Sequence, residues 1–218
     1  MWFPVAIDVL AGVLLVAVWY CVFVRLNRRR SARVLAWLET SFAGHGQVAG
    51  VQWLTPSRFQ VKLTLANSGF KDSSILVQLA PREMPIRWLL EYFRKTRETL
   101  TFEANLHCPP NFNLYVQNHR WCGRTRRKLP RDPQGWNLER VGPFIISSRN
   151  DWQREISNLM NSTMASRACD FLSISFRRTS PHFSATVALD SLTASHEQEI
   201  SIFDVLRELA SGASASRF

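Results

Sequence analysis

The stretch from Val9 to Val24 reads VLAGVLLVAVWYCVFV and holds no charged side chain. Ten of its residues are Leu, Val or Phe, each of which favours membrane insertion by about 0.3–0.6 kcal/mol. This contribution outweighs the cost of Asp8, because a carboxylate near one end of a helix reaches the interface. With its N-terminal neighbours the stretch reaches about 24 residues, enough at ~1.5 Å per residue to cross a hydrocarbon core of ~30 Å. The sequence therefore predicts an N-terminal transmembrane helix.

Five arginines follow the apolar stretch, and no basic residue precedes it. They are Arg25, Arg28, Arg29, Arg30 and Arg33. Basic residues next to a membrane helix stay on the cytoplasmic side, so we expect the N-terminus outside and the C-terminal domain in the cytoplasm. A cleaved signal peptide carries its basic residues before the apolar run. We therefore interpret residues 1–30 as a single-pass signal anchor with a basic flank.

The composition of the 218 residues is typical of a folded, basic protein. A hydrophobic fraction of 46%, with 14 Phe and 8 Trp, is enough for a packed core and argues against disorder. Residues 31–218 hold 23 basic and 16 acidic side chains, a net charge of +7 that favours anionic neighbours. Outside the anchor, Cys108, Cys122 and Cys169 have no regular spacing, which suits a reducing compartment better than a disulfide framework.

Alternating apolar and polar residues predict a mainly antiparallel sheet after the anchor. The segment 58–66 is the clearest case, with Phe59, Val61 and Leu63 on one side. We expect strands at 48–54, 58–66, 74–79, 99–106, 112–116, 144–147, 170–177 and 183–189, and helices at 31–43, 85–97, 152–164 and 200–210. Short turns between strands favour an α+β fold with the helices packed on one face of the sheet. This domain would span residues 31–210, with a flexible tail at 211–218, and an internal duplication of its two halves stays open.

An irregular segment at 119–141 is rich in Arg, Pro and Gly. Its six cations lie within twelve residues: Arg120, Arg124, Arg126, Arg127, Lys128 and Arg131. Near an anionic bilayer each contributes about 1 kcal/mol, so lipid contact is one interpretation and an acidic protein partner is another. Trp121 and Trp136 would also suit stacking on nucleic acid bases, but no RNA-binding motif supports this third alternative. The simplest alternative is a solvated loop that only adds solubility.

Two histidines and two cysteines form the best candidate for a metal site: His107, Cys108, His119 and Cys122. Such a set can bind zinc in a tetrahedral arrangement. However, His107 and Cys108 are adjacent, and neighbours in a strand point to opposite faces. The sequence also lacks the G-x-S-x-G and G-x-G-x-x-G patterns. We therefore predict no cofactor and keep a zinc-dependent or other enzyme as the alternative.

Together these patterns favour a non-enzymatic, membrane-tethered interaction or scaffold domain. The expected partners are the lipid bilayer, contacted through the basic segments, and another membrane or cytoplasmic protein. An enzyme that uses the His107 region and a nucleic-acid-binding protein remain as alternatives from other classes.

Overall fold

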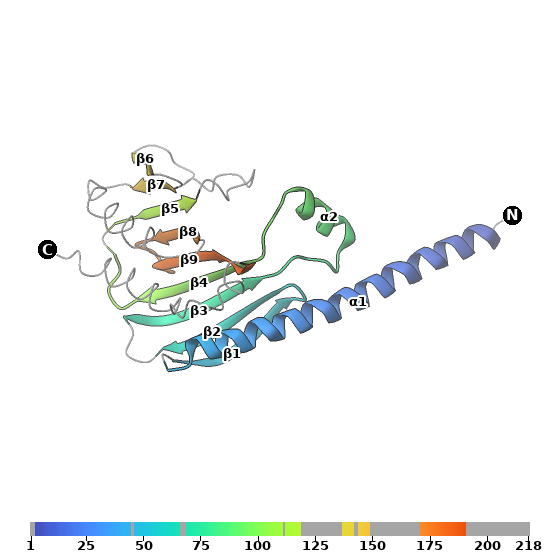
Figure 1. Ribbon diagram of the computed structural model, residues 1–218, viewed down its shortest axis with the longest axis horizontal. Coiled ribbons are helices and arrows are strands. Elements are labelled where there is room, and N and C mark those ends of the chain that lie inside the picture. The colour runs from blue at the N-terminus through green and yellow to red at the C-terminus, as the bar shows by residue number, and fades with distance from the viewer. Residues whose placement is uncertain are drawn as a thin grey trace.

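A nine-stranded antiparallel sheet and one long N-terminal helix dominate the computed structural model (Figure 1). The structure describes residues 3–44, 46–65, 69–110, 112–118, 137–141, 144–148 and 171–190. Every pair of neighbouring strands is antiparallel, so the predicted α+β class and sheet type agree with the structure.

The first helix, α1, spans Phe3–Phe42 without interruption. Its 40 residues measure about 60 Å. The separate helix expected at 31–43 is the C-terminal part of α1, because neither Gly nor Pro occurs between Gly12 and Gly44. Gly44 ends the helix with a φ of 91°, a left-handed conformation that glycine adopts without strain.

The first four strands are neighbours in the order in which the chain forms them. They are β1 (Gly46–Thr55), β2 (Arg58–Leu65), β3 (Phe70–Gln78) and β4 (Thr99–Leu106). The predicted bounds of the fourth strand are confirmed, while the third begins four residues before the expected 74. The expected inward residues of β2, Phe59, Val61 and Leu63, are buried.

The second half of the sheet has a different strand order. Its strands are β5 (Leu114–Asn118), β6 (Asn137–Val141), β7 (Phe144–Ser148), β8 (Phe171–Phe176) and β9 (Phe183–Ala188). The complete order is β1-β2-β3-β4-β9-β8-β5-β7-β6, so β4 and β9 join the two halves. The predicted hairpin of β8 and β9 is confirmed. The expectation that 119–141 is irregular is wrong for its last five residues, because β6 pairs with β7.

A row of aromatic rings crosses the join between the two halves. Phe102 of β4 lies 5.5 Å from Phe70 and 6.1 Å from Phe183, measured between ring centroids. Phe183 in turn lies 4.9 Å from Phe176, which lies 5.9 Å from Phe112. All five are buried, so the two halves share one hydrophobic core.

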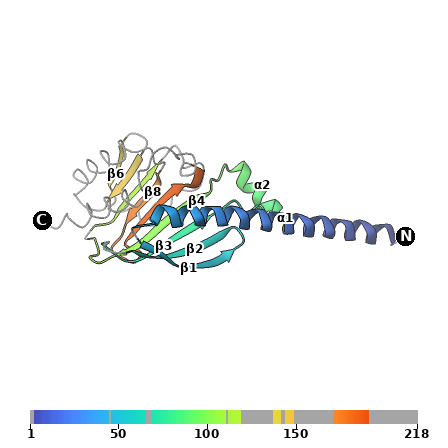
Figure 2. The same ribbon diagram turned by 60° about the horizontal axis from the view of Figure 1, so that its bottom comes forward.

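The two described helices differ in how they relate to this core. Val34, Leu38 and Phe42 of α1 belong to it, so the C-terminal end of α1 covers the sheet (Figure 2). The helix α2 (Pro85–Phe93) has no buried residue, so the expectation that it packs on the sheet is wrong, and it ends four residues before 97. The helices expected at 152–164 and 200–210 and the tail at 211–218 lie outside the described residues.

Candidate membrane-contact site

The N-terminal half of α1 projects beyond the sheet, as Figure 1 shows. This half is long and apolar enough to cross a membrane, and its most apolar stretch has no buried residue. Residues 3–24 alone measure about 33 Å, which matches a hydrocarbon core of ~30 Å. Soluble monomers rarely expose an apolar surface of this extent. The N-terminal half of α1 is therefore the candidate membrane span.

One face of α1 continues from this span into the core of the sheet. Its buried residues follow one another at intervals of three or four, the spacing of a single helix face: Asn27, Ser31, Val34, Leu38 and Phe42. The apolar members contact the core, whereas the first two are polar. Along this face, the polar residues Asn27 and Ser31 are therefore followed by apolar residues that contact the core. The part around Asn27 is called the polar junction below.

Asn27 makes the first contact of the polar junction. Its Nδ2 donates a hydrogen bond of 2.8 Å to Oε2 of Glu83 and one of 3.3 Å to the carbonyl oxygen of Ala80. Asn27 and Glu83 are both buried, and a buried carboxylate without a donor costs far more than one with a partner. Asn27 thus fixes the loop before α2 to α1.

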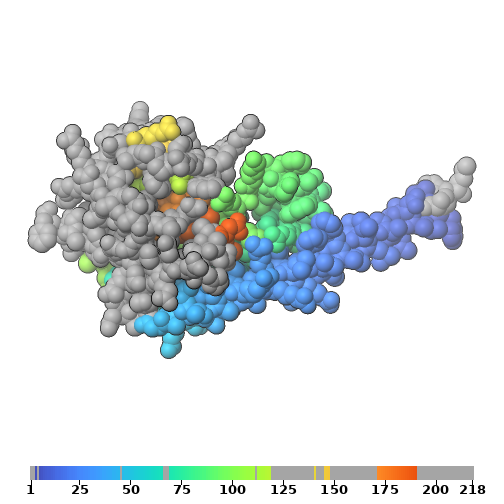
Figure 3. Space-filling view, in the orientation of Figure 1, coloured from blue at the N-terminus to red at the C-terminus, as the bar shows by residue number. Residues whose placement is uncertain are grey.

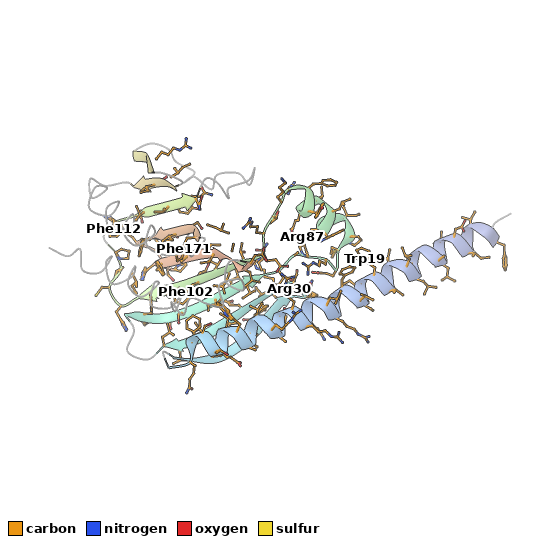
Figure 4. All side chains as sticks on the ribbon, viewed as in Figure 1. Trp19, Arg30, Arg87, Phe102, Phe112 and Phe171 are labelled. Atoms are coloured by element: carbon orange, nitrogen blue, oxygen red, sulfur yellow. The ribbon has the colours of Figure 1, made fainter. Side chains whose placement is uncertain are left out.

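Glu98 makes the second contact, after α2. Its carboxylate oxygens lie 2.9 Å from Nη2 of Arg30 and 3.2 Å from Nη2 of Arg82, and the backbone N–H of Ala80 donates to it at 3.4 Å. Arg30, which Figure 4 labels on α1, also lies 3.8 Å from Asp190. Glu98 is buried, so this carboxylate joins α1, the loop before α2 and the start of β4 through charge-assisted contacts.

The basic flank is therefore divided between two roles. Arg30 is paired with the domain, whereas Arg25, Arg28, Arg29 and Arg33 are exposed and form no ion pair with any residue that the structure describes. These four guanidinium groups are available to anionic groups outside the protein.

Trp19 links α2 to the apolar part of α1. Its Nε1 donates a hydrogen bond of 3.0 Å to the carbonyl oxygen of Arg82, and its ring lies 6.3 Å from the ring of Trp88 on α2. On the same side of α1, the ring of Phe23 lies 4.4 Å from that of Trp19 in a tilted arrangement. In Figure 3, α2 stands out from the body beside α1, and Figure 4 shows Trp19 at the level of α2. α2 is therefore next to the candidate membrane span.

The side chains of α2 fall on three sides of the helix at about 100° per residue. Trp88 and Tyr92 form an aromatic side, and Arg87 forms an ion pair of 3.3 Å with Glu91 on a polar side. The third side is apolar and exposed to solvent: Ile86, Leu89, Leu90 and Phe93. Ile86 is 78% exposed and Phe93 is 74% exposed, so nothing in the described part of the chain covers this side.

The metal candidates are only partly within the structure. His107 and Cys108 are exposed directly after β4. Among the described residues, no group of three or more His, Cys, Asp or Glu side chains is arranged to hold a metal ion. His119, Cys122 and the six loop cations from Arg120 to Arg131 lie outside the described residues.

A cavity of about 670 Å³ opens on the polar side of β2, β3 and β4. Its lining includes charged side chains of both signs, Lys62, Asp72 and Glu103, together with the amide of Asn105. This mixture is typical of the hydrated face of a sheet, and the described lining contains no histidine or cysteine.

The junction residues Asn27, Glu83 and Glu98 were not predicted from the sequence. The spacing of Asn27, Ser31 and Val34 was a usable signal, because it extends the apolar face of the domain helix back into the arginine-rich segment.

No protein-family model matches the chain, and no curated protein is significantly similar to it.

Proposed function

We propose that this chain is a single-pass membrane protein whose cytoplasmic α+β domain binds a membrane-associated partner without catalysing a reaction. The observation that supports it most strongly is the continuity of α1 from an exposed apolar half into the buried core of the sheet. A helix shared by anchor and domain keeps the domain next to the membrane surface. Confinement of this kind raises the effective concentration of the domain toward other membrane components.

The charges next to the span support the orientation. Arg25, Arg28, Arg29 and Arg33 are exposed just after the apolar half, and the only charged residue before Val24 is Asp8. Such an asymmetry retains the following domain in the cytoplasm. The same four arginines can bind the anionic head groups of the inner leaflet, together with the loop cations.

The topology is tested with a reporter fused after Phe218. We expect the reporter to be protected from protease added outside intact cells, and we expect the full chain to stay in the membrane pellet after alkaline carbonate, because the span is integral to the bilayer. Cells opened with detergent provide the control for protease activity. Release by carbonate, or a reporter that is cleaved from outside, would refute the proposed placement.

Lipid contact by the loop is tested by replacing its six cations, from Arg120 to Arg131, with Gln. A fragment that begins at Leu26 keeps Asn27 and Arg30, and circular dichroism first verifies that it is folded. Six cations at about 1 kcal/mol each set an upper limit of about 10⁴-fold, and contact by only two of them would already weaken binding to phosphatidylserine vesicles by at least about tenfold. Sedimentation with the vesicles measures this change.

A charge-matched comparison separates loop contact from net charge. One variant replaces Arg124, Arg126 and Arg127 with Gln, and the other replaces the exposed sheet cations Arg58, Lys62 and Lys71. Only the first should bind the anionic vesicles more weakly, and neither should change the weak binding to phosphatidylcholine. Equal losses in the two variants would show that net charge, not the loop, is responsible.

A further inference from the structure

We propose that α2 is a second membrane-contacting element, an interfacial helix that inserts its apolar side into the leaflet from which α1 emerges. The inference rests on the proposed function, because it requires α1 to span the membrane. It concerns Ile86, Leu89, Leu90 and Phe93, whose side chains are exposed.

The depth of α2 follows from its contact with Trp19. Trp19 precedes Arg25 by six residues, or about 9 Å along the axis of α1. If the arginines mark the head groups, Trp88 lies about this far below them, since its ring contacts Trp19. Amphipathic interfacial helices are buried about 5–10 Å below this boundary, and Trp residues are enriched there. The placement of α2 therefore agrees with that of an interfacial helix.

The segment that carries α2 is held against α1. The segment that carries it is fastened on both sides, by Glu83 to Asn27 and by Glu98 to Arg30. Asn27 and Arg30 are only about 4.5 Å apart along α1. From these two points the segment extends along α1 toward Trp19 (Figure 4), whose ring lies 6.3 Å from that of Trp88.

Lipid is the occupant that the surroundings of α2 favour. The Trp19–Trp88 contact holds α2 beside the exposed apolar half of α1, so the hydrophobic environment that surrounds this half can also cover the apolar side of α2. Arg94 and Lys95 are exposed where α2 ends, and long basic side chains of this kind can reach lipid head groups from an interfacial helix. Lys95 adopts a φ of 51°, which ends the helix there.

The test uses the full chain in phosphatidylcholine and phosphatidylserine vesicles, with all four native cysteines replaced by Ala. A nitroxide label is placed at Leu89→Cys on α2 or at Leu54→Cys on β1. Leu89 and Leu54 are each 47% exposed, so they differ in location and not in burial. A third label at Val13→Cys reports on the span. Relaxation by oxygen, which concentrates in lipid, is compared with relaxation by a water-soluble nickel chelate.

We expect a several-fold higher oxygen-to-nickel ratio at position 89 than at position 54. Equal ratios at 89 and 54, with a lipid signature at 13, would overturn the proposal for α2 and leave the anchor intact. Shielding of position 89 from both reagents would also overturn it, because a protein surface would then cover the helix. A water signature at position 13 would refute the proposed membrane span itself.

Discussion

Replacement of Leu38 with Ala is expected to lower the free energy of unfolding by about 2–5 kcal/mol. Leu38 is fully buried where the C-terminal part of α1 covers the sheet, so truncation leaves a cavity in the shared core. Tryptophan fluorescence of the full chain in detergent micelles, followed through a denaturant titration, measures the loss.

Leu26→Ala is the matched control for this change. Leu26 belongs to the same helix and is 45% exposed, so its replacement should alter stability by no more than about 0.5 kcal/mol. Equal losses at Leu38 and Leu26 would contradict the packing of α1 on the sheet. They would also remove the main support for a domain that is rigidly joined to its anchor.

Replacement of Glu98 with Gln is expected to cost about 1–3 kcal/mol. Breaking a fully buried ion pair typically costs about 3–5 kcal/mol, but Arg30 and Arg82 are partly exposed and water can solvate them in the variant. Gln keeps the size of the side chain and an acceptor for the backbone N–H of Ala80, so the change isolates the charge. The same denaturant titration measures this loss.

Glu103→Gln provides the control for the loss of one negative charge. Glu103 lies on β4, five residues after Glu98, and forms no ion pair within the described part of the chain. Its replacement should leave stability nearly unchanged. A similar cost for both variants would indicate a general effect of net charge and would contradict a structural role for the contacts of Glu98 with Arg30 and Arg82.

The strands were predictable because their pattern is local. In β2 and β4, apolar side chains alternate with polar ones, and burial of one face requires this alternation whatever the neighbouring strands are. The hairpin of β8 and β9 follows from two such runs with a short turn. The pairing of β4 with β9 was not predictable, because it joins residues far apart in the sequence and no local pattern specifies the partner.

The helices show where periodicity is ambiguous. In α2, Ile86, Leu89 and Phe93 have the spacing of a core-facing helix, but the same spacing is produced by a helix with an apolar side that nothing in the described chain covers. The continuity of α1 was missed because the arginines suggested a boundary at residue 30. A change of polarity does not end a helix, and no helix-breaking residue is present there.

The candidate site was only partly predictable for a related reason. The exposed arginines of the flank were found from their position after the apolar run. Asn27 and Glu98 were missed because each is buried and contacts a residue far away in the sequence. Asn27 contacts Glu83, and Glu98 contacts Arg30. The spacing of polar residues does not indicate such contacts. The loop cations and the pair His119 and Cys122 stay predictions, since they lie outside the described residues.

The unbroken α1 has a mechanical consequence for the proposed membrane anchor. Membrane helices tilt by about 20° on average, and the angle changes with bilayer thickness. The part of α1 after Val24 is about 27 Å long, so a tilt of about 20° moves its far end sideways by about 9 Å. Because α1 is continuous, a change in the tilt of its N-terminal half would displace the sheet sideways over the membrane surface. Bilayer thickness would thereby determine which neighbouring membrane proteins the domain can contact.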